Sequence, residues 1–136
     1  MKKILLVISL AFLLSGCFPG LAKPGGGNKD KPGDFLQGRV AKGFPSLPMY
    51  PEAKLAESYS DAESYGASSY TKDEIGKVVE FYDMGLVQLG WESSRVDNSD
   101  GSYTFNIKNQ IQKGWVIINY AIDGKTVAIS YSVTKR

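Results

Sequence analysis

The 136-residue sequence has no histidine and only one cysteine. Without histidine the chain cannot build a Ser–His–Asp or Cys–His nucleophile system, and it cannot ligate a metal through imidazole. A single cysteine forms neither an intramolecular disulfide nor a cysteine-cluster zinc site. These absences remove common routes to hydrolytic and metal chemistry.

Composition and charge exclude two further classes. With 43% hydrophobic and 22% charged residues, the chain is neither a disordered polyelectrolyte nor a protein with many membrane spans, and its length suits one domain. If an N-terminal signal containing Lys2 and Lys3 is removed, the 16 basic residues fall to 14, equal to the 14 acidic ones. A neutral mature chain gives no reason to expect a nucleic-acid partner.

The longest apolar run lies near the N-terminus, where Ile4–Leu14 is interrupted only by Ser9. As a helix this run spans about 17 Å, too short for the ~30 Å hydrocarbon core of a bilayer. A basic start followed by a short apolar stretch is typical of a signal peptide. We therefore assign residues 1–16 to a cleaved signal.

The apolar run leads into Leu14-Ser15-Gly16-Cys17, which resembles the lipobox of bacterial lipoproteins at all four positions. The resemblance implies cleavage between Gly16 and Cys17, a diacylglyceryl group on the Cys17 thiol, and acylation of the new amino group by a chain such as palmitate. Several acyl chains, at about 0.8 kcal/mol per buried CH₂, hold a protein firmly in a membrane. An ordinary secretory signal with a chance cysteine, or an uncleaved anchor, is the alternative.

The residue after the cysteine bears on localisation. In bacteria with two membranes, Asp at that place favours retention in the inner membrane, and this chain has Phe18 instead. The resemblance therefore implies the periplasmic side of the outer membrane in such a host. In a host with one membrane it implies the outer face of the cytoplasmic membrane.

Residues 17–43 are predicted to be the lipidated cysteine and a flexible tether, because glycine and proline are frequent and no helical or strand periodicity is present. Phe35, Leu36 and Val40 are the apolar exceptions, and they dock either on the domain or on a partner. From residue 44 the composition changes, and three prolines stiffen an extended lead-in. We place one globular domain at residues 44–136.

One helical pattern interrupts a series of strand patterns. Apolar residues recur at steps of three and four over Lys72–Leu89, Thr71 and Glu74 are spaced as a capping box, and Gly90 follows as a C-terminal residue that tolerates positive φ. Strand patterns cover Ala53–Tyr59, Tyr65–Tyr70, Trp91–Val96, Tyr103–Lys108, Trp115–Ile122 and Val127–Thr134. The order β-β-α-β-β-β-β predicts an α+β fold, with a single amphipathic helix packed on one face of an antiparallel sheet.

Three short phrases add a resemblance. Leu47–Ala53, Phe81-Tyr82 and Leu89-Gly90-Trp91 resemble uncharacterised exported bacterial domains in which a "YP-x-A" entry precedes a helix that ends in "GW". The resemblance covers most of residues 47–136. It implies the fold and carries no activity.

The strand at residues 115–122 supplies the candidate binding residues. If Val116, Ile118, Tyr120 and Ile122 face the helix, Trp115 and Ile117 lie on the opposite face, where neighbouring strands place small and polar residues. An exposed aromatic residue on such a face marks a possible partner-binding surface. The alternative is that the proline-rich lead-in or a loop covers Trp115.

No catalytic residue stands out. The acidic pairs Asp61–Glu63, Asp73–Glu74 and Asp97–Asp100 fall in predicted turns or at the helix start, where carboxylates accept bonds from amides. The segment that begins at Asp97 fails the EF-hand spacing, since Lys108 occupies the position of the final Glu ligand. A serine–lysine pair is conceivable, but nothing singles one out. We therefore expect no metal site, no cofactor and no enzymatic activity.

Three classes of function follow. The first is a non-enzymatic lipoprotein that binds or supports another component of the cell envelope, a protein partner among them. The second is a module that holds a small apolar ligand between helix and sheet. The third is a hydrolase acting on cell-wall or lipid substrates.

Replacement of Cys17 by serine tests the anchor. Because the thiol carries the lipid, Cys17→Ser should leave an unprocessed precursor and abolish acyl labelling. Metabolic labelling with a radioactive fatty acid, followed by gel mobility, measures both effects. Equal labelling of the variant and the wild type would contradict the lipoprotein assignment.

Overall fold

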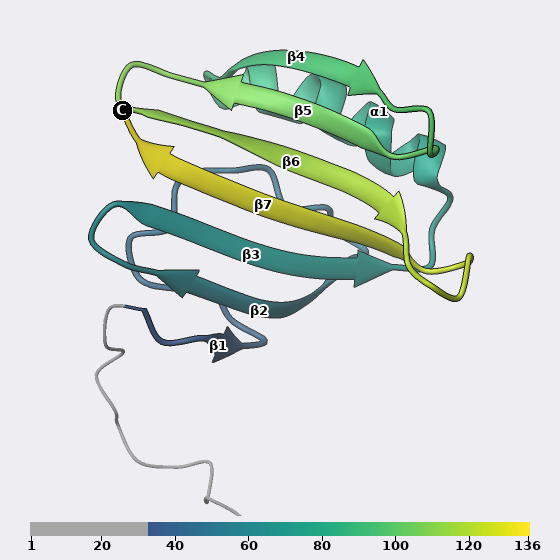
Figure 1. Ribbon diagram of the computed structural model, residues 1–136, viewed down its shortest axis with the longest axis horizontal. Helices are drawn as coiled ribbons and strands as arrows, with labels where there is room; N and C mark the ends of the chain where they lie inside the picture. Colours follow the sequence, from purple (N-terminus) through teal and green to yellow (C-terminus); the bar gives the residue numbers. More distant parts are fainter. Residues whose placement is uncertain (1–32) are drawn as a thin grey trace, which may run out of the picture.

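The computed structural model describes residues 33–136, which form one antiparallel sheet and one helix (Figure 1). The predicted cleavage and lipidation at Gly16 and Cys17 lie outside the described residues. The elements are β1 (Leu36–Gln37), β2 (Lys54–Ser60), β3 (Ser64–Thr71), α1 (Ile75–Gln88), β4 (Glu92–Asp97), β5 (Tyr103–Lys108), β6 (Gln112–Tyr120) and β7 (Val127–Lys135). The strands lie in the order β1-β2-β3-β7-β6-β5-β4.

The mixed α+β class with a mainly antiparallel sheet is confirmed, and the details differ from the predicted order. The sheet has seven strands, and the helix follows the third strand because β1 precedes the first predicted one. Leu36 and Gln37 pair with Ser58 and Glu57 of β2, and Leu36 is buried while Phe35 and Val40 stay exposed. The sheet therefore begins at Leu36, ahead of the first predicted strand at Ala53–Tyr59. A two-residue strand is too short to show a periodicity in the sequence.

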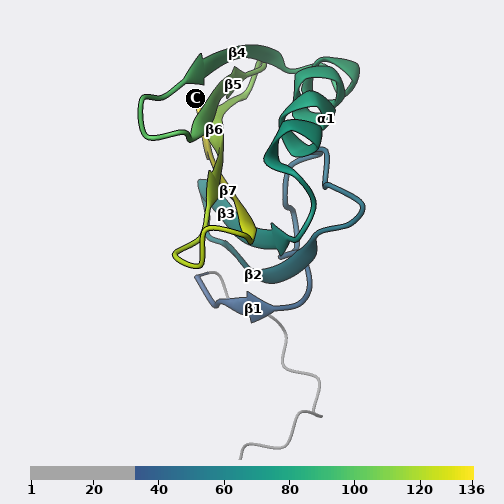
Figure 2. The same cartoon turned by 90° about the vertical axis from the view of Figure 1, so that its right-hand side faces the viewer.

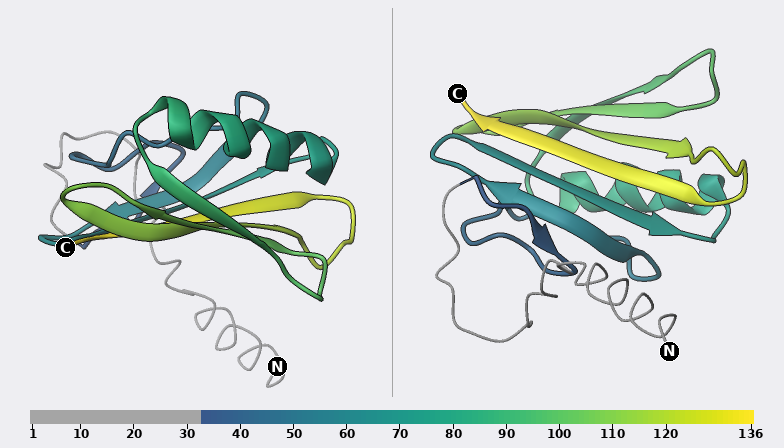
Figure 3. Two further views of the ribbon diagram at one scale, coloured as in Figure 1. Left: turned by 90° about the horizontal axis from the view of Figure 1, so that it is seen from above. Right: turned by 60° about the horizontal axis from the view of Figure 1, so that its bottom comes forward.

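One face of the sheet is covered by two parts of the chain, the helix α1 and residues 38–53. The buried face of α1, formed by Val78, Val79, Tyr82 and Leu86, joins the core with side chains from β5, β6 and β7. The proline-containing lead-in, defined from here on as residues 38–53 to include the residues that precede it, lies on the same side of the sheet as α1 (Figure 2). Seen from above, α1 runs along one side of the twisted sheet (Figure 3, left).

Specific contacts hold the lead-in in place. The Ser58 hydroxyl donates to the Arg39 carbonyl oxygen at 2.6 Å, and the Trp91 indole N–H donates to the Ser46 carbonyl oxygen at 2.9 Å. Pro48 lies against Gly85 of α1, where an added Cβ would come within 3.0 Å of the proline Cβ. The lead-in is therefore the close neighbour that favours glycine at this position of the helix.

The ends of α1 agree with the sequence only in part. Gly90 has φ +84°, as a residue with positive φ after the helix should. The predicted capping box is wrong, because Thr71 is the last residue of β3 and pairs with Val127. Its hydroxyl accepts from the Asp73 N–H at 3.2 Å, and the N-cap residue Glu74 makes no side-chain cap bond. Because Thr71 is paired in the sheet, it does not cap the helix, which begins at Ile75.

A chain of buried hydroxyls links α1 to the sheet. The hydroxyls of Tyr82 and Tyr131 are hydrogen-bonded to each other, and the Tyr131 hydroxyl lies 3.4 Å from the Ser69 hydroxyl of β3. Burial raises the pKa of both phenols. The two tyrosines therefore stay neutral, and each buried hydroxyl has a partner.

The predicted orientation of one strand needs correction at its end. Val116 and Ile118 of β6 are completely buried beneath α1, as expected. Tyr120 is 47% exposed and Ile122 lies beyond the strand, fully exposed, so neither packs against the helix. The strand ends at Tyr120, two residues earlier than predicted, because the chain turns there: the Gly124 N–H donates to the Ala121 carbonyl oxygen at 2.9 Å.

Two glycine-to-alanine variants should shift stability in opposite directions. A Cβ at Gly114 would lie 2.0 Å from the Ser132 backbone oxygen, so Gly114→Ala should cost at least about 1–3 kcal/mol. A Cβ at Gly76 of α1 meets nothing within 4 Å, so Gly76→Ala should gain up to about 1 kcal/mol.

Thermal unfolding of the two variants, made as lipid-free chains of residues 18–136, measures the difference. About 4–8 °C is expected per kcal/mol for a domain of this size. A Gly114→Ala variant that melts with the wild type would show that β6 and β7 do not approach as closely as described.

Candidate binding site on the outer face of the sheet

The face of the sheet that points away from α1, here called the outer face, is turned toward the viewer in Figure 1. The strand register places four residues directly opposite one another across it: Ser94 of β4, Asn106 of β5, Trp115 of β6 and Ser132 of β7. Side chains alternate along a strand, so the residues beside buried Val116 and Ile118 point to this face. Trp115 and Ile117 thus lie together where the sequence places them, and their binding role stays a prediction.

Trp115 is partly open to solvent although its strand is interior to the sheet. The residue is 37% exposed, because the side chains beside it on β5 and β7 are the small or polar Asn106 and Ser132. The lead-in contacts β2, α1 and Trp91 on the opposite side of the sheet. The alternative that the lead-in covers Trp115 is therefore wrong.

Trp115 lines an open groove of about 630 Å³ that crosses β4, β5, β6 and β7. The lining residues are Glu92, Ser93, Ser94, Asn106, Ile107, Lys108, Lys113, Gly114, Trp115, Ser132 and Thr134. The sequence pointed to Trp115 and to part of its surroundings. It did not indicate the lysines or the β4 residues, because their place in the groove depends on strand order.

The groove carries more positive than negative charge. Lys108 forms an ion pair with Glu92, with 3.0 Å between Nζ and Oε2. Lys113 lies opposite Lys108 and Thr134 in the ladders, and it makes no ion pair within residues 33–136. One ammonium group at this end of the groove is therefore available to an anionic group.

Several hydroxyl and amide groups of the groove are also available. Within the described part of the chain, no hydrogen bond reaches the side chains of Ser94, Asn106, Ser132 or Thr134. These four groups can both donate and accept. The groove thus combines one aromatic ring with polar groups that have no protein partner among the described residues.

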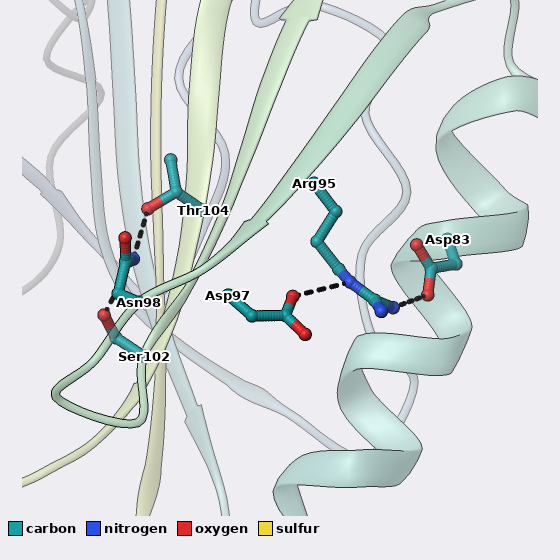
Figure 4. A network of polar contacts seen from close by, with 6 residues as sticks. All are labelled: Asp83, Arg95, Asp97, Asn98, Ser102 and Thr104. Carbon is teal, nitrogen blue, oxygen red and sulfur yellow. Dashed lines mark hydrogen bonds and ion pairs between the residues drawn. The ribbon is translucent and has the colours of Figure 1, made fainter.

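Several acidic residues form ion pairs or stabilise turns. Arg95 bridges Asp83 of α1 and Asp97 of β4, and Asn98 donates to the hydroxyls of Ser102 and Thr104 (Figure 4). The ion pair with Asp83, together with Asp97, raises the pKa of the Arg95 guanidinium. This network ties the helix to the edge strand β4.

Two other carboxylates hold tight turns. Asp61 accepts from the backbone amides of Glu63 and Ser64, and Asp100 accepts from the hydroxyl and amide of Ser102. These bonds lower the pKa of both carboxyls. Asp73 accepts from the Tyr50 hydroxyl at 2.7 Å, and this bond raises the pKa of Tyr50 to about 12.

Two Ser-x-x-Lys patterns that the sequence analysis did not single out occur at Ser69–Lys72 and Ser132–Lys135. Ser132 and Lys135 lie on β7, where positions three apart point to opposite faces, and Ser69 lies on β3 while Lys72 follows the end of that strand. Within residues 33–136 no group of three His, Cys, Asp or Glu side chains could hold a metal ion.

Comparison with known proteins identifies the anchor. Residues 1–17 match the family model of the prokaryotic membrane lipoprotein lipid attachment site. The chain is therefore a lipid-anchored protein of the bacterial cell envelope. It is a membrane lipoprotein, as the lipobox at Leu14–Cys17 predicts.

The remaining comparisons concern the domain. No curated protein and no solved structure matches the chain. The resemblance of residues 47–136 to exported bacterial domains stays a prediction. No helix in residues 33–136 is long and apolar enough to cross a membrane.

Removal of one hydroxyl should change the pKa of Asp123. The Thr126 hydroxyl donates to the Asp123 carboxylate at 2.6 Å, and the amides of Thr126 and Lys125 donate as well, which lowers its pKa to about 2. Thr126→Val removes the largest of these contributions, so the pKa should rise toward the ordinary value of about 3.9. Carboxyl ¹³C chemical shifts followed between pH 1 and 6 measure it, with Thr134→Val as the control.

The same interaction sets a pH dependence of stability. The Asp123 carboxyl has a lower pKa in the folded than in the unfolded chain, so its contribution is present above about pH 4 and is lost as the pH falls through about 2. The difference in melting temperature between wild type and Thr126→Val should therefore shrink in that window. An unchanged Asp123 titration in Thr126→Val would refute this account of the turn.

Proposed function

We propose that this lipoprotein is a non-enzymatic binding module of the cell envelope. The lipid on Cys17 holds it at the membrane, and the outer face around Trp115 and Ile117 binds another envelope component. The observation that carries the proposal is a tryptophan, 37% exposed, in a groove on the face of the sheet away from α1 and the lead-in. Exposed aromatic residues in concave sites are frequent contributors to binding energy.

The length of chain between anchor and domain allows such contacts. The Gly33 N–H donates to the Ser60 carbonyl oxygen at 2.7 Å, so the described fold begins there. The sixteen residue steps from Cys17 to Gly33 span at most about 55 Å. The outer face can therefore reach envelope components whose distance from the membrane does not exceed the length of this segment plus the size of the domain.

Phe18 after the lipidated cysteine favours the periplasmic side of the outer membrane in a host with two membranes. In a host with one membrane, the same anchor would hold the domain on the outer face of the cytoplasmic membrane. Both locations bring the domain close to the cell wall.

A small apolar ligand between helix and sheet is a weaker candidate. Tyr82, Leu86, Phe105 and Ile118 are at most 1% exposed and belong to one contiguous core. A ligand in that place would have to displace them. The third candidate, a hydrolase, has no specific observation in its favour, and we expect no product release from cell-wall or lipid substrates.

A photo-cross-linking experiment tests the binding face. A benzophenone amino acid at Trp115 should cross-link in intact cells to an envelope component, whereas the same group at Val87 should not. Val87 is 62% exposed on α1, so it is at least as accessible as Trp115 but lies on the other side of the sheet. Equal yields at both positions, or none at Trp115, would contradict the proposal.

Stability measurements separate binding from folding. Because Trp115 is already partly exposed, Trp115→Ala should lower stability less than the about 3–5 kcal/mol typical of truncating a buried aromatic residue. Thermal melts of the lipid-free chain measure the loss. A loss in that full range would show that Trp115 serves the core.

A further inference from the structure

We propose that the ligand of the groove is an acidic glycan, namely the cell-wall strand of sugar rings with its carboxylate-bearing peptide stems. This inference rests on the proposed binding function and names its ligand class. It follows from three properties of the groove: one exposed aromatic ring, a set of unpartnered hydroxyl and amide groups, and an unpaired cation. These properties match the three kinds of group that such a strand presents.

The indole of Trp115 provides the apolar contact. A sugar ring has hydroxyls around its edge and C–H groups on its faces, so a face can lie against an aromatic ring while the hydroxyls remain free to bond. Tryptophan suits this role because it offers a large rigid surface. At 37% exposure, a substantial part of the indole of Trp115 is open to such a contact.

The flanking polar groups provide hydrogen bonds. Ser94, Asn106 and Ser132 lie in one row with Trp115 across four strands, which at about 4.8 Å per strand extends over about 14 Å. That length suits a short run of sugar units lying across the strands. The side chains of Ser94, Asn106, Ser132 and Thr134 have no hydrogen-bond partner in residues 33–136, so they can bond sugar hydroxyls and acetamido groups.

The lysines provide charge complementarity. Lys113 makes no ion pair in the described part of the chain, and Lys108 has Glu92 as its only acidic partner there. Charge-assisted bonds from an ammonium group to a carboxylate are stronger than neutral ones. An anionic glycan therefore fits this groove better than a neutral one.

The composition of the groove argues against a protein as the ligand. Protein interface cores are depleted in Ser, Lys and Glu. Those types supply Ser93, Ser94, Ser132, Lys108, Lys113 and Glu92 here. Among the large apolar residues of the lining, Ile107 is only 3% exposed, so Trp115 alone offers apolar surface.

Co-sedimentation with purified cell-wall sacculi tests the inference. The probe is the full mature lipoprotein in detergent, and the wild type should pellet with the sacculi. Trp115→Ala should weaken binding about tenfold or more, as expected for an aromatic residue at the centre of a site. Val87→Ala, at an exposed apolar position of α1, should bind like the wild type. Melting temperatures of the variants show whether each is folded.

A binding titration with soluble ligands separates recognition of the sugar from recognition of the charge. Soluble wall fragments with acidic stems should bind more tightly than an uncharged oligomer of N-acetylglucosamine. Lys113→Gln should weaken binding of the acidic fragments only, and added salt should reduce the same difference. Equal affinities of wild type and Lys113→Gln for the acidic fragments would overturn the assignment of charge.

The outcomes distinguish this inference from the function on which it rests. If sacculi and fragments fail to bind while the cross-linker at Trp115 captures an envelope protein, the glycan is wrong and the binding face stands. If the sacculi and fragments do not bind and the cross-linker at Trp115 captures nothing, both the glycan assignment and the proposed binding face are wrong. If Trp115→Ala is folded and pellets like the wild type, binding does not use the groove and the inference is overturned.

Discussion

The fold depends on covering one face of a wide sheet with a single helix. Seven strands at about 4.8 Å spacing make a sheet about 29 Å across, whereas a helix is about 10 Å in diameter. α1 therefore cannot bury the whole face, and the lead-in covers the part that α1 leaves open. Contacts such as that between Pro48 and Gly85 fit these two coverings to each other.

Tyr82 lies where these parts meet. Its ring is near those of Phe105 on β5 and Tyr131 on β7, and its neighbour Phe81 packs edge-on against Tyr50 of the lead-in, with 5.3 Å between ring centroids. The hydrogen bond between the hydroxyls of Tyr82 and Tyr131 is directional, so it fixes the position of the helix over the sheet more specifically than apolar packing alone. The core is thus contiguous from lead-in to β5.

Because α1 and the lead-in both cover the same face of the sheet, the outer face remains open for binding. On the outer face, short side chains on β5 and β7 flank Trp115, and Gly114 allows β6 to approach β7 closely. The result is a groove with free polar groups and an unpaired Lys113 within the described chain. A lipid anchor on Cys17 would hold this surface at the cell envelope.

The sequence by itself determined the anchor, the α+β class and the outward position of Trp115, because each depends on local chemistry or on a short period. It could not reveal β1, whose two residues gain stability only from pairing with β2. It misplaced Tyr120 and the helix cap, because the true limits of β6 and β3 depend on the turn that follows Tyr120 and on the pairing of Thr71 with Val127. Only the tertiary structure brought Lys113 and Ser94 to the groove, since strand neighbours are decided by long-range pairing.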